Sequence, residues 1–228
     1  MLKKAPLILS FIVISSVSTI AQKSKEQPVQ TNANISNSGL DYYSIKEKVF
    51  REALKYGDLL VAKQALYEMI AIKPSEKNLR DSLAFIYINM GSPKEAILLS
   101  REILANDPGN VNILEVKAIA QQSLGMSKEA LTDYESLYSK SNSIFHLYQI
   151  ATLQYELKRV AECNASIEKI INNPESEKRE INIGTGNRGQ QQNVSLKAAA
   201  LNVKGVLAMD LNENAIAKAC FENALKLN

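Results

Sequence analysis

Few of the side chains that build active sites and metal centres occur in this sequence. The chain of 228 residues has one histidine, His146, two cysteines and no tryptophan. A metal site with two histidine ligands is therefore excluded, and we expect His146 to be solvated or to cap a helix. Catalysis and metal binding need clusters of such groups. The sequence therefore predicts a chain that is not an enzyme and that holds no metal and no cofactor.

A strong excess of charge of either sign is also missing. The chain has 27 Lys and Arg residues against 24 Asp and Glu residues, and removal of a leader containing Lys3 and Lys4 leaves 25 basic residues. A nucleic-acid-binding domain needs a basic face or stripe. The balance of charges therefore predicts no nucleic-acid partner.

Long apolar runs are missing except at the N-terminus. Residues 1–21 begin with Lys3 and Lys4, continue with an apolar run and end with small residues at Thr19 and Ala21. This pattern is typical of a signal peptide cleaved after Ala21, and an uncleaved membrane anchor is the alternative. Because it resembles bacterial export signals, we expect an exported protein, periplasmic or peripheral to the outer membrane, with no integral membrane segment after cleavage.

The segment that follows the apolar run is polar. Residues 22–40 are rich in Asn, Gln and Ser and show no helical stripe. Such a segment cannot bury enough apolar surface to offset the entropy lost on ordering. We expect residues 22–40 to form a disordered linker, followed by one domain over residues 41–228.

That domain repeats itself at an interval of 34 residues. Three glycines and three alanines keep this spacing: Gly57, Gly91 and Gly125, and Ala62, Ala96 and Ala130. A fixed period of this length indicates one supersecondary unit that is stacked several times.

The local sequence of the second copy predicts a pair of helices. The first helix, from Asn78 to Met90, ends at Gly91, because a C-terminal cap often needs the positive φ that glycine adopts without strain. Ser92 and Glu95 are then expected to form a capping box at the start of the second helix. Pro108 stops that second helix.

These features resemble the tetratricopeptide repeat family, with repeats at 43–76, 77–110, 111–143, 144–174 and 198–228. The matching residues are Ala84, Ala96, Ile103 and Pro108 in the second repeat, Ala118, Ala130, Tyr134 and Leu137 in the third, and Gly205, Ala217, Phe221, Ala224 and Leu225 in the last. The resemblance implies an all-α fold, an α-solenoid of antiparallel helix pairs in a right-handed superhelix. It also implies a function in protein binding.

An insertion at 175–196 separates the last two repeats. Residues 179–183 and 192–196 alternate polar and apolar side chains around a glycine-rich segment, which favours a short β-hairpin, and a flexible loop is the alternative. We expect this insertion to contact a partner. Residues 184–189 match the GxGxxG pattern, but a dinucleotide site needs that pattern between a strand and a helix. We therefore expect no nucleotide there.

The two cysteines, Cys163 and Cys220, fall on second helices of different repeats. A disulfide needs Cα atoms roughly 4.4–6.8 Å apart, whereas packed helices lie about 8–10 Å apart. We expect both to be buried free thiols.

The family resemblance also implies a partner-binding surface, a concave groove lined by the first helix of each repeat. Transferred residue by residue, its contact positions are Glu47, Arg51, Asp81, Phe85, Ile88, Glu115, Ile119, Tyr148, Tyr155, Val206 and Met209. Glu47, Asp81 and Glu115 would form an acidic ladder, with three ordinary solvated carboxylates as the alternative. We expect a protein or peptide partner with apolar anchors and basic residues.

The C-terminal helix raises a separate question, because its apolar side is expected to face a further repeat that the sequence does not contain. Either the chain is a fragment, or a second copy or another protein covers this edge. The sequence as a whole predicts a non-enzymatic protein–protein interaction scaffold in the bacterial cell envelope. The alternative is a structural component of an envelope assembly or secretion complex.

Overall fold

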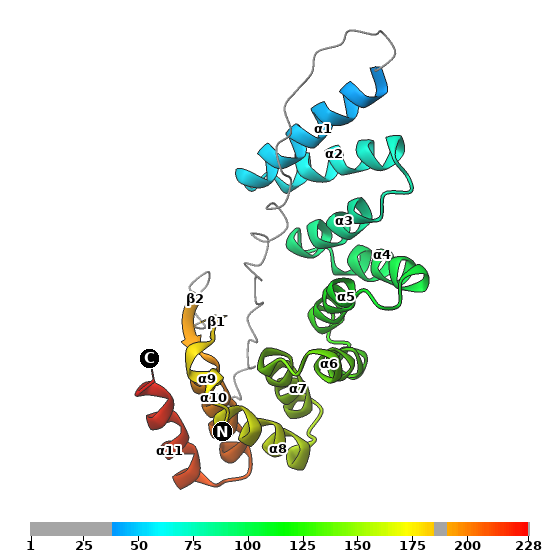
Figure 1. Ribbon diagram of the computed structural model, residues 1–228. Coiled ribbons are helices and arrows are strands. Elements are labelled where there is room, and N and C mark those ends of the chain that lie inside the picture. The colour runs from blue at the N-terminus through cyan, green and yellow to red at the C-terminus, as the bar shows by residue number, and fades with distance from the viewer. Residues whose placement is uncertain (1–37, 185–190, 228) are drawn as a thin grey trace, which may run out of the picture. The chain divides into compact units, whose positions relative to one another are not determined.

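The computed structural model describes residues 38–184 and 191–227, which form successive pairs of helices (Figure 1). The pairs are α1 (Ser38–Lys55) with α2 (Leu59–Ile72), α3 (Lys77–Asn89) with α4 (Pro93–Asn106), α5 (Val111–Ser123) with α6 (Ser127–Ser141), α7 (Ile144–Glu156) with α8 (Val160–Ile171), and α10 (Leu196–Asp210) with α11 (Asn214–Leu225). Each predicted repeat contains one pair. The expected all-α repeat architecture is confirmed.

The chain divides into two compact units at the boundary between Val116 and Lys117, inside α5. We call the part before this boundary the N-terminal unit and the part after it the C-terminal unit. The predicted signal peptide, residues 1–21, lies outside the described residues. Helix α1 begins at Ser38, three residues inside the segment 22–40 that was expected to be linker. None of the helices described is long and apolar enough to cross a membrane.

A left-handed residue joins the two helices of every pair. Gly57, Gly91 and Gly125 have φ values of 71°, 69° and 71°, as predicted for the first three repeats. Lys158 and Asn212 take the same place in the last two, with φ values of 58° and 62°. The tight turn is therefore kept even where glycine is absent, because the hydrogen bonds around it fix the geometry.

The hydrogen bonds of the second repeat illustrate this turn. Beyond Gly91, the N–H of Ser92 donates to the carbonyl oxygen of Tyr87 at 2.9 Å, which satisfies one of the last carbonyls of α3. Pro93 then begins α4, but Ser92 makes no side-chain capping bond, so the predicted capping box is wrong. Asp58 in a similar backbone conformation does cap α2, because its longer side chain reaches the N–H of Val61 at 3.1 Å.

The core of the N-terminal unit lies where α2 packs against α1 and α3. Its buried residues are Tyr43, Ala53, Ala62, Leu66, Met69, Leu79, Leu83 and Ile86. Burial of aliphatic side chains at roughly 25 cal/mol per Å² is the main stabilising term in such a core. The core is shared between neighbouring repeats, so no helix pair in this unit is stable by itself.

The insertion in the C-terminal unit is ordered at its base. A short helix, α9 (Glu175–Lys178), precedes strands β1 (Glu180–Gly184) and β2 (Gln191–Ser195), which pair antiparallel. Ile181 and Val194 are register partners, and both are buried in the same cluster as residues of α7, α8 and α10. The hairpin interpretation is confirmed over the flexible loop.

The glycine-rich motif that begins at Gly184 has no dinucleotide-site context. Gly184 ends β1 and pairs with Gln191, and the remainder of the motif falls in residues 185–190, outside the described residues. The motif therefore connects two antiparallel strands, whereas a dinucleotide site needs a helix N-terminus after it.

Substitution of Gly91 by alanine should lower the free energy of unfolding by about 1 kcal/mol. A Cβ in the left-handed conformation costs roughly 1–2 kcal/mol, although the space around Gly91 is open. Lys158→Gly should have the opposite sign and raise stability by up to about 1 kcal/mol. Urea unfolding followed by circular dichroism measures both effects.

The matched control for this prediction is Gly109→Ala. Gly109 does not have a left-handed backbone, and a Cβ added there meets only a carboxylate oxygen of Asp107 at 3.8 Å. Equal losses of stability at Gly91 and Gly109 would contradict the assigned role of the turn.

Candidate partner-binding surface

The predicted contact residues of the first two repeats lie on α1 and α3. Arg51 is exposed, while Glu47, Asp81, Phe85 and Ile88 are partly buried. We call the surface formed by these five residues the first-helix face. All five belong to the N-terminal unit.

The charge of α1 on this face is largely neutralised. Arg51 donates to the Glu47 carboxylate at 2.6 Å, one helical turn away. Such exposed pairs stabilise a helix by about 0.3–0.5 kcal/mol. Glu47 therefore presents an ion pair to a partner rather than a free carboxylate.

Asp81 has a structural partner in the next repeat. The side-chain amide of Asn110 donates to Asp81 Oδ2 at 2.9 Å, and Asn110 Oδ1 accepts from the N–H of Ile113 at 3.2 Å. Asn110 thus caps the start of α5 and ties it to α3. The other oxygen, Asp81 Oδ1, is buried and has no hydrogen-bond partner among the described residues. Asp81 therefore stabilises the packing of two neighbouring repeats, in addition to lying at a predicted contact position.

The third acid of the expected ladder is also occupied. Glu115 on α5 is partly buried and interacts with other described residues. The structure therefore does not present three free carboxylates in a row. Ile119, on the same helix, is partly buried and belongs to the C-terminal unit.

Tyr148 was predicted to contact a partner, and the structure corrects this. Its side chain is buried in the core of the C-terminal unit, in the same cluster as Ile181 and Val194 of the hairpin. The Arg179 guanidinium lies 5.5 Å from the centre of the Phe145 ring at the start of α7, so the base of the insertion packs on this helix. Burial raises the pKa of Tyr148 to about 12. The sequence pattern predicted the hairpin but not the burial of Tyr148.

The remaining contact positions of the C-terminal unit cluster near the end of α10. Tyr155 on α7 donates its hydroxyl hydrogen to Asp210 Oδ2 at 2.7 Å. Partial burial and, to a lesser degree, this carboxylate raise the pKa of Tyr155 to about 12. Met209 is exposed and Val206 is partly buried. Tyr155 therefore links α7 to α10, and only Met209 is fully available to a partner.

His146 is buried and not solvated, contrary to expectation. Its Nδ1 lies 2.9 Å from the Ser141 hydroxyl oxygen, and its ring stands 6.2 Å from the ring of Tyr134 and 5.9 Å from that of Phe145. His146 is position 3 of its repeat, counted from the first residue of 144–174. Position 3 is also buried in the other later repeats, at Leu79, Ile113 and Ala200. An isolated histidine in a sequence does not reveal that packing.

Both cysteines are buried free thiols, as predicted. The Cys163 thiol donates to the Ala151 carbonyl oxygen at 3.3 Å, and burial raises its pKa to about 11. Burial also raises the pKa of Cys220.

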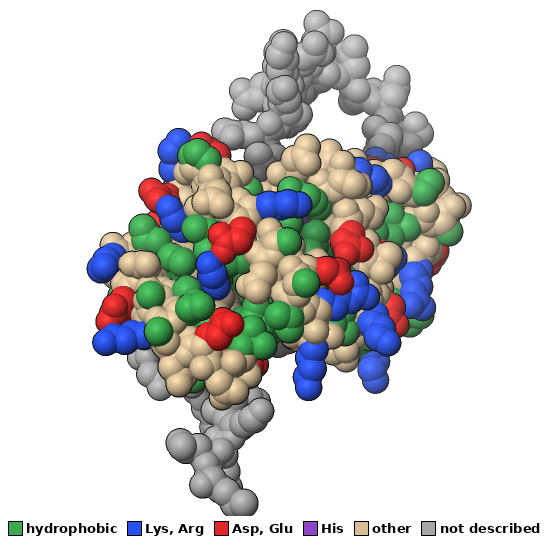
Figure 2. Space-filling model, turned by 90° about the horizontal axis from the view of Figure 1, so that it is seen from below, with side chains coloured by type: hydrophobic (Ala, Val, Ile, Leu, Met, Phe, Trp, Pro, Cys, Tyr) green, Lys and Arg blue, Asp and Glu red, His purple; other side chains and the backbone are tan. Residues whose placement is uncertain are grey.

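Within residues 38–184 and 191–227 no three His, Cys, Asp or Glu residues could hold a metal ion. On the face seen in Figure 2, acidic and basic side chains alternate with hydrophobic patches.

A polar network between α1 and α2 was missed by sequence reasoning. Glu68 accepts from the Tyr42 hydroxyl at 2.6 Å and pairs with Lys46 at 2.5 Å. These bonds, with that of Lys46 the larger effect, lower the pKa of Glu68. The hydroxyls of Tyr67 and Tyr87 form a hydrogen bond between α2 and α3. The only available signal was the abundance of tyrosine in residues 42–87.

Two acids of the predicted ladder should differ in their effect on stability. Asp81→Ala should lower the free energy of unfolding by about 1 kcal/mol, because Asn110 loses its acceptor. Glu47→Ala should change it by less than about 0.5 kcal/mol. Urea unfolding measures both, and a double variant with Asn110→Ala should be clearly non-additive with Asp81→Ala. Additive effects of these two substitutions would contradict the structural role of Asp81.

Comparison with known proteins relies on structure alone. No model of a known protein family matches the sequence, and no curated protein matches it. A tetratricopeptide repeat protein from Parabacteroides merdae ATCC 43184 has a similar structure, with a TM-score of 0.66 and 19% identity over 82% of this chain. The matched part of this chain spans 66% of that protein.

MamA proteins have similar structures too. MamA from residue 41 to its end, from Desulfovibrio magneticus RS-1, matches 82% of this chain and 95% of its own, with a TM-score of 0.67 and 13% identity. A further MamA structure matches 82% of this chain and 92% of its own, with a TM-score of 0.63 and 14% identity. Likeness at such identities shows the fold. The chain has the tetratricopeptide repeat fold, an α-solenoid fold that generally serves as a protein-interaction scaffold.

Proposed function

We propose that the chain is a non-enzymatic scaffold of the bacterial cell envelope that holds a segment of a partner protein on its first-helix face. The observation that carries this proposal is the position of Phe85 and Ile88. Both are large apolar residues on α3, and neither is fully buried by the stacking of the repeats. A partly buried apolar pair beside ionic groups is a typical anchor site of protein interfaces.

The chemistry of the face defines the partner. Phe85 and Ile88 are three residues apart on one helix, so they can receive apolar side chains of a helical or extended segment. The exposed Glu47–Arg51 ion pair on α1 can open, so that one of its two side chains pairs with a charged group of the partner instead. The apolar anchors therefore supply most of the affinity, and a basic residue near Glu47 supplies orientation.

The location in the envelope rests on the sequence of residues 1–21, with its basic start, apolar run and small residues before Gln22. An exported scaffold meets partners that the cytoplasm does not contain. The alternative, a structural part of an envelope assembly or secretion complex, is favoured by the exposed apolar residues Ile45 and Val49 on α1. A receptor binds a short segment alone, whereas a structural part is found only in a stable complex.

The test is cross-linking of the full-length protein in envelope fractions, followed by mass spectrometry of partners and cross-link sites. We expect links from Lys46 and Lys48 to one short segment of one protein. Ile88→Lys should reduce the recovery of that protein by about tenfold, because it places a charge in the apolar anchor.

Leu98→Lys is the matched control, since Leu98 is an exposed leucine on α4, away from the first-helix face. Circular dichroism checks that both variants remain helical. Equal recovery with Ile88→Lys and Leu98→Lys would contradict binding at this face. Links concentrated at Lys178 and Lys197 to several proteins would instead support the assembly component.

A further inference from the structure

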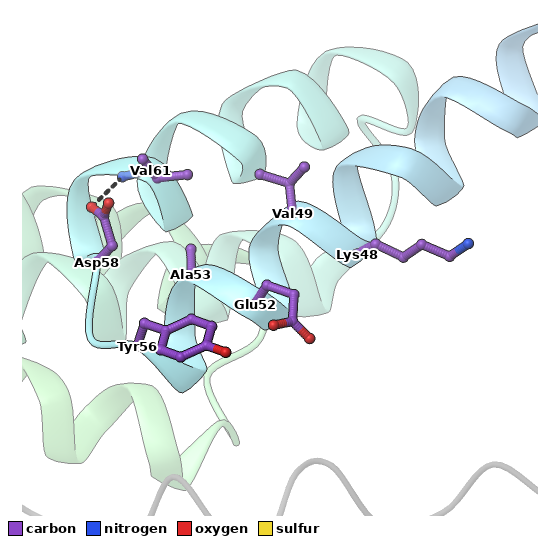
Figure 3. Close-up of a pocket in the computed structure, with 7 residues that line it drawn as sticks. All are labelled: Lys48, Val49, Glu52, Ala53, Tyr56, Asp58 and Val61. Atoms are coloured by element: carbon purple, nitrogen blue, oxygen red, sulfur yellow. Dashed lines mark hydrogen bonds between the residues drawn. The ribbon is translucent and has the colours of Figure 1, made fainter.

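An apolar surface lies on the outer side of the first helix pair. It consists of the exposed residues Ile45, Val49 and Tyr56 on α1 and Val61 on α2, together with one charged residue of α1, Glu52. We call it the outer face of the first repeat. A shallow hollow of about 400 Å³ lies there, with Val49, Ala53 and Val61 beside one another (Figure 3). Ile45 is 47% exposed and Tyr56 is 74% exposed.

The same repeat positions are buried in later repeats. Ile45 and Glu52 occupy positions 3 and 10 of the first repeat. In the second repeat these positions are Leu79 and Ile86, and both are buried against α2. The equivalent residues of α7 and α10 are also buried: His146, Leu153, Ala200 and Leu207. The outer face of the first repeat therefore has the geometry of a repeat interface, and no second helix among residues 38–184 and 191–227 covers it.

The exposed side of α11 has the complementary character. Leu225 is at position 28 of the last repeat and is 74% exposed. The equivalent residues Ile70 and Tyr138 are partly buried and pack against the two cores. Lys218, at position 21, has a side chain that is 76% exposed.

Two contacts inside the units fix the register between a second helix and the first helix that follows it. The hydroxyls of Tyr67 and Tyr87 join position 25 to position 11 of the next repeat. Glu168 pairs with Lys204 at 2.5 Å, which joins position 25 to position 7. The helices run antiparallel, so these contacts place position 28 opposite positions 4 to 8 of the next repeat, and position 21 opposite positions 11 to 15.

We propose that a second copy of this chain docks its α11 on the outer face of the first repeat, so that copies associate head to tail. In the register of the internal interfaces, Leu225 of one copy meets Ile45 and Val49 of the next. Lys218 then lies opposite Tyr56, and its ammonium can reach Glu52 one helical turn away. Because this contact uses two different surfaces, it generates an open chain or a ring of copies and not a symmetric dimer.

The charges support this arrangement over a nonspecific apolar contact. Among the described residues, the ion-pair partner of Glu52 is Lys55 at 3.7 Å and that of Lys218 is Glu222 at 3.8 Å, and both distances are long. Such exposed pairs within one helix are worth little and exchange readily. Glu52 stands where later repeats carry a buried apolar residue, and Lys218 stands where α4 and α6 carry Ile97 and Leu131. A Glu–Lys pair thus takes a place that is apolar inside the solenoid.

Sedimentation velocity of the full chain over a range of concentrations tests the proposal without any partner protein. The weight-average mass of the wild type should rise with concentration. Glu52→Lys and Lys218→Glu should each weaken association by at least about tenfold, since each places like charges opposite one another. An equimolar mixture of the two variants, and the double variant, should regain association, because both combinations restore opposite charges.

Two controls separate this contact from others. Lys128→Glu changes an exposed lysine on α6, away from both surfaces, and should leave association unchanged. Leu225→Asp should abolish association, whereas Leu98→Asp should not. A wild-type mass that stays that of one copy at all concentrations would overturn the proposal, as would charge variants that fail to rescue one another. Ile88→Lys should associate normally, so failure of this proposal is distinguishable from failure of the proposed function.

Discussion

Burial of each first helix against the helix pair before it is the constraint on which the rest of this structure depends. Leu79 and Ile86 of α3 are covered by α2, and His146 of α7 packs against Tyr134 of α6. The left-handed turn between the helices of a pair serves this packing, because it returns the chain in a fixed direction. A helix pair without its neighbour would leave a row of apolar side chains in water.

The same constraint determines which side chains remain for function. Positions used in stacking are removed from the surface, and Tyr148 is buried in the core of the C-terminal unit. What remains on the first-helix face is the pair Phe85 and Ile88 on α3 and the Glu47–Arg51 ion pair on α1. Asp81 already binds Asn110. We therefore expect the apolar pair, rather than a row of three carboxylates, to contribute most to partner binding.

Periodicity allowed the fold to be predicted, because glycine, alanine and apolar residues recur in positions with a physical reason. Lys158 shows the limit of the pattern: it adopts the left-handed turn with no glycine signal. The candidate site was less predictable, because transfer of contact positions assumes that nothing else covers them. The burial of Tyr148 and the bond between Asp81 and Asn110 both depend on tertiary contacts, which a repeat pattern does not contain.

Amide hydrogen exchange of the full chain in dilute solution tests the central claim most directly. It compares equivalent segments, residues 45–52 of α1 and 79–86 of α3; within residues 38–184 and 191–227, a helix pair precedes α3 but none precedes α1. The account predicts that the amides of α1 exchange on the order of ten times faster than those of α3, because local opening of α1 exposes less buried apolar surface. Equal protection of the two segments would contradict the dependence of each repeat on the one before it.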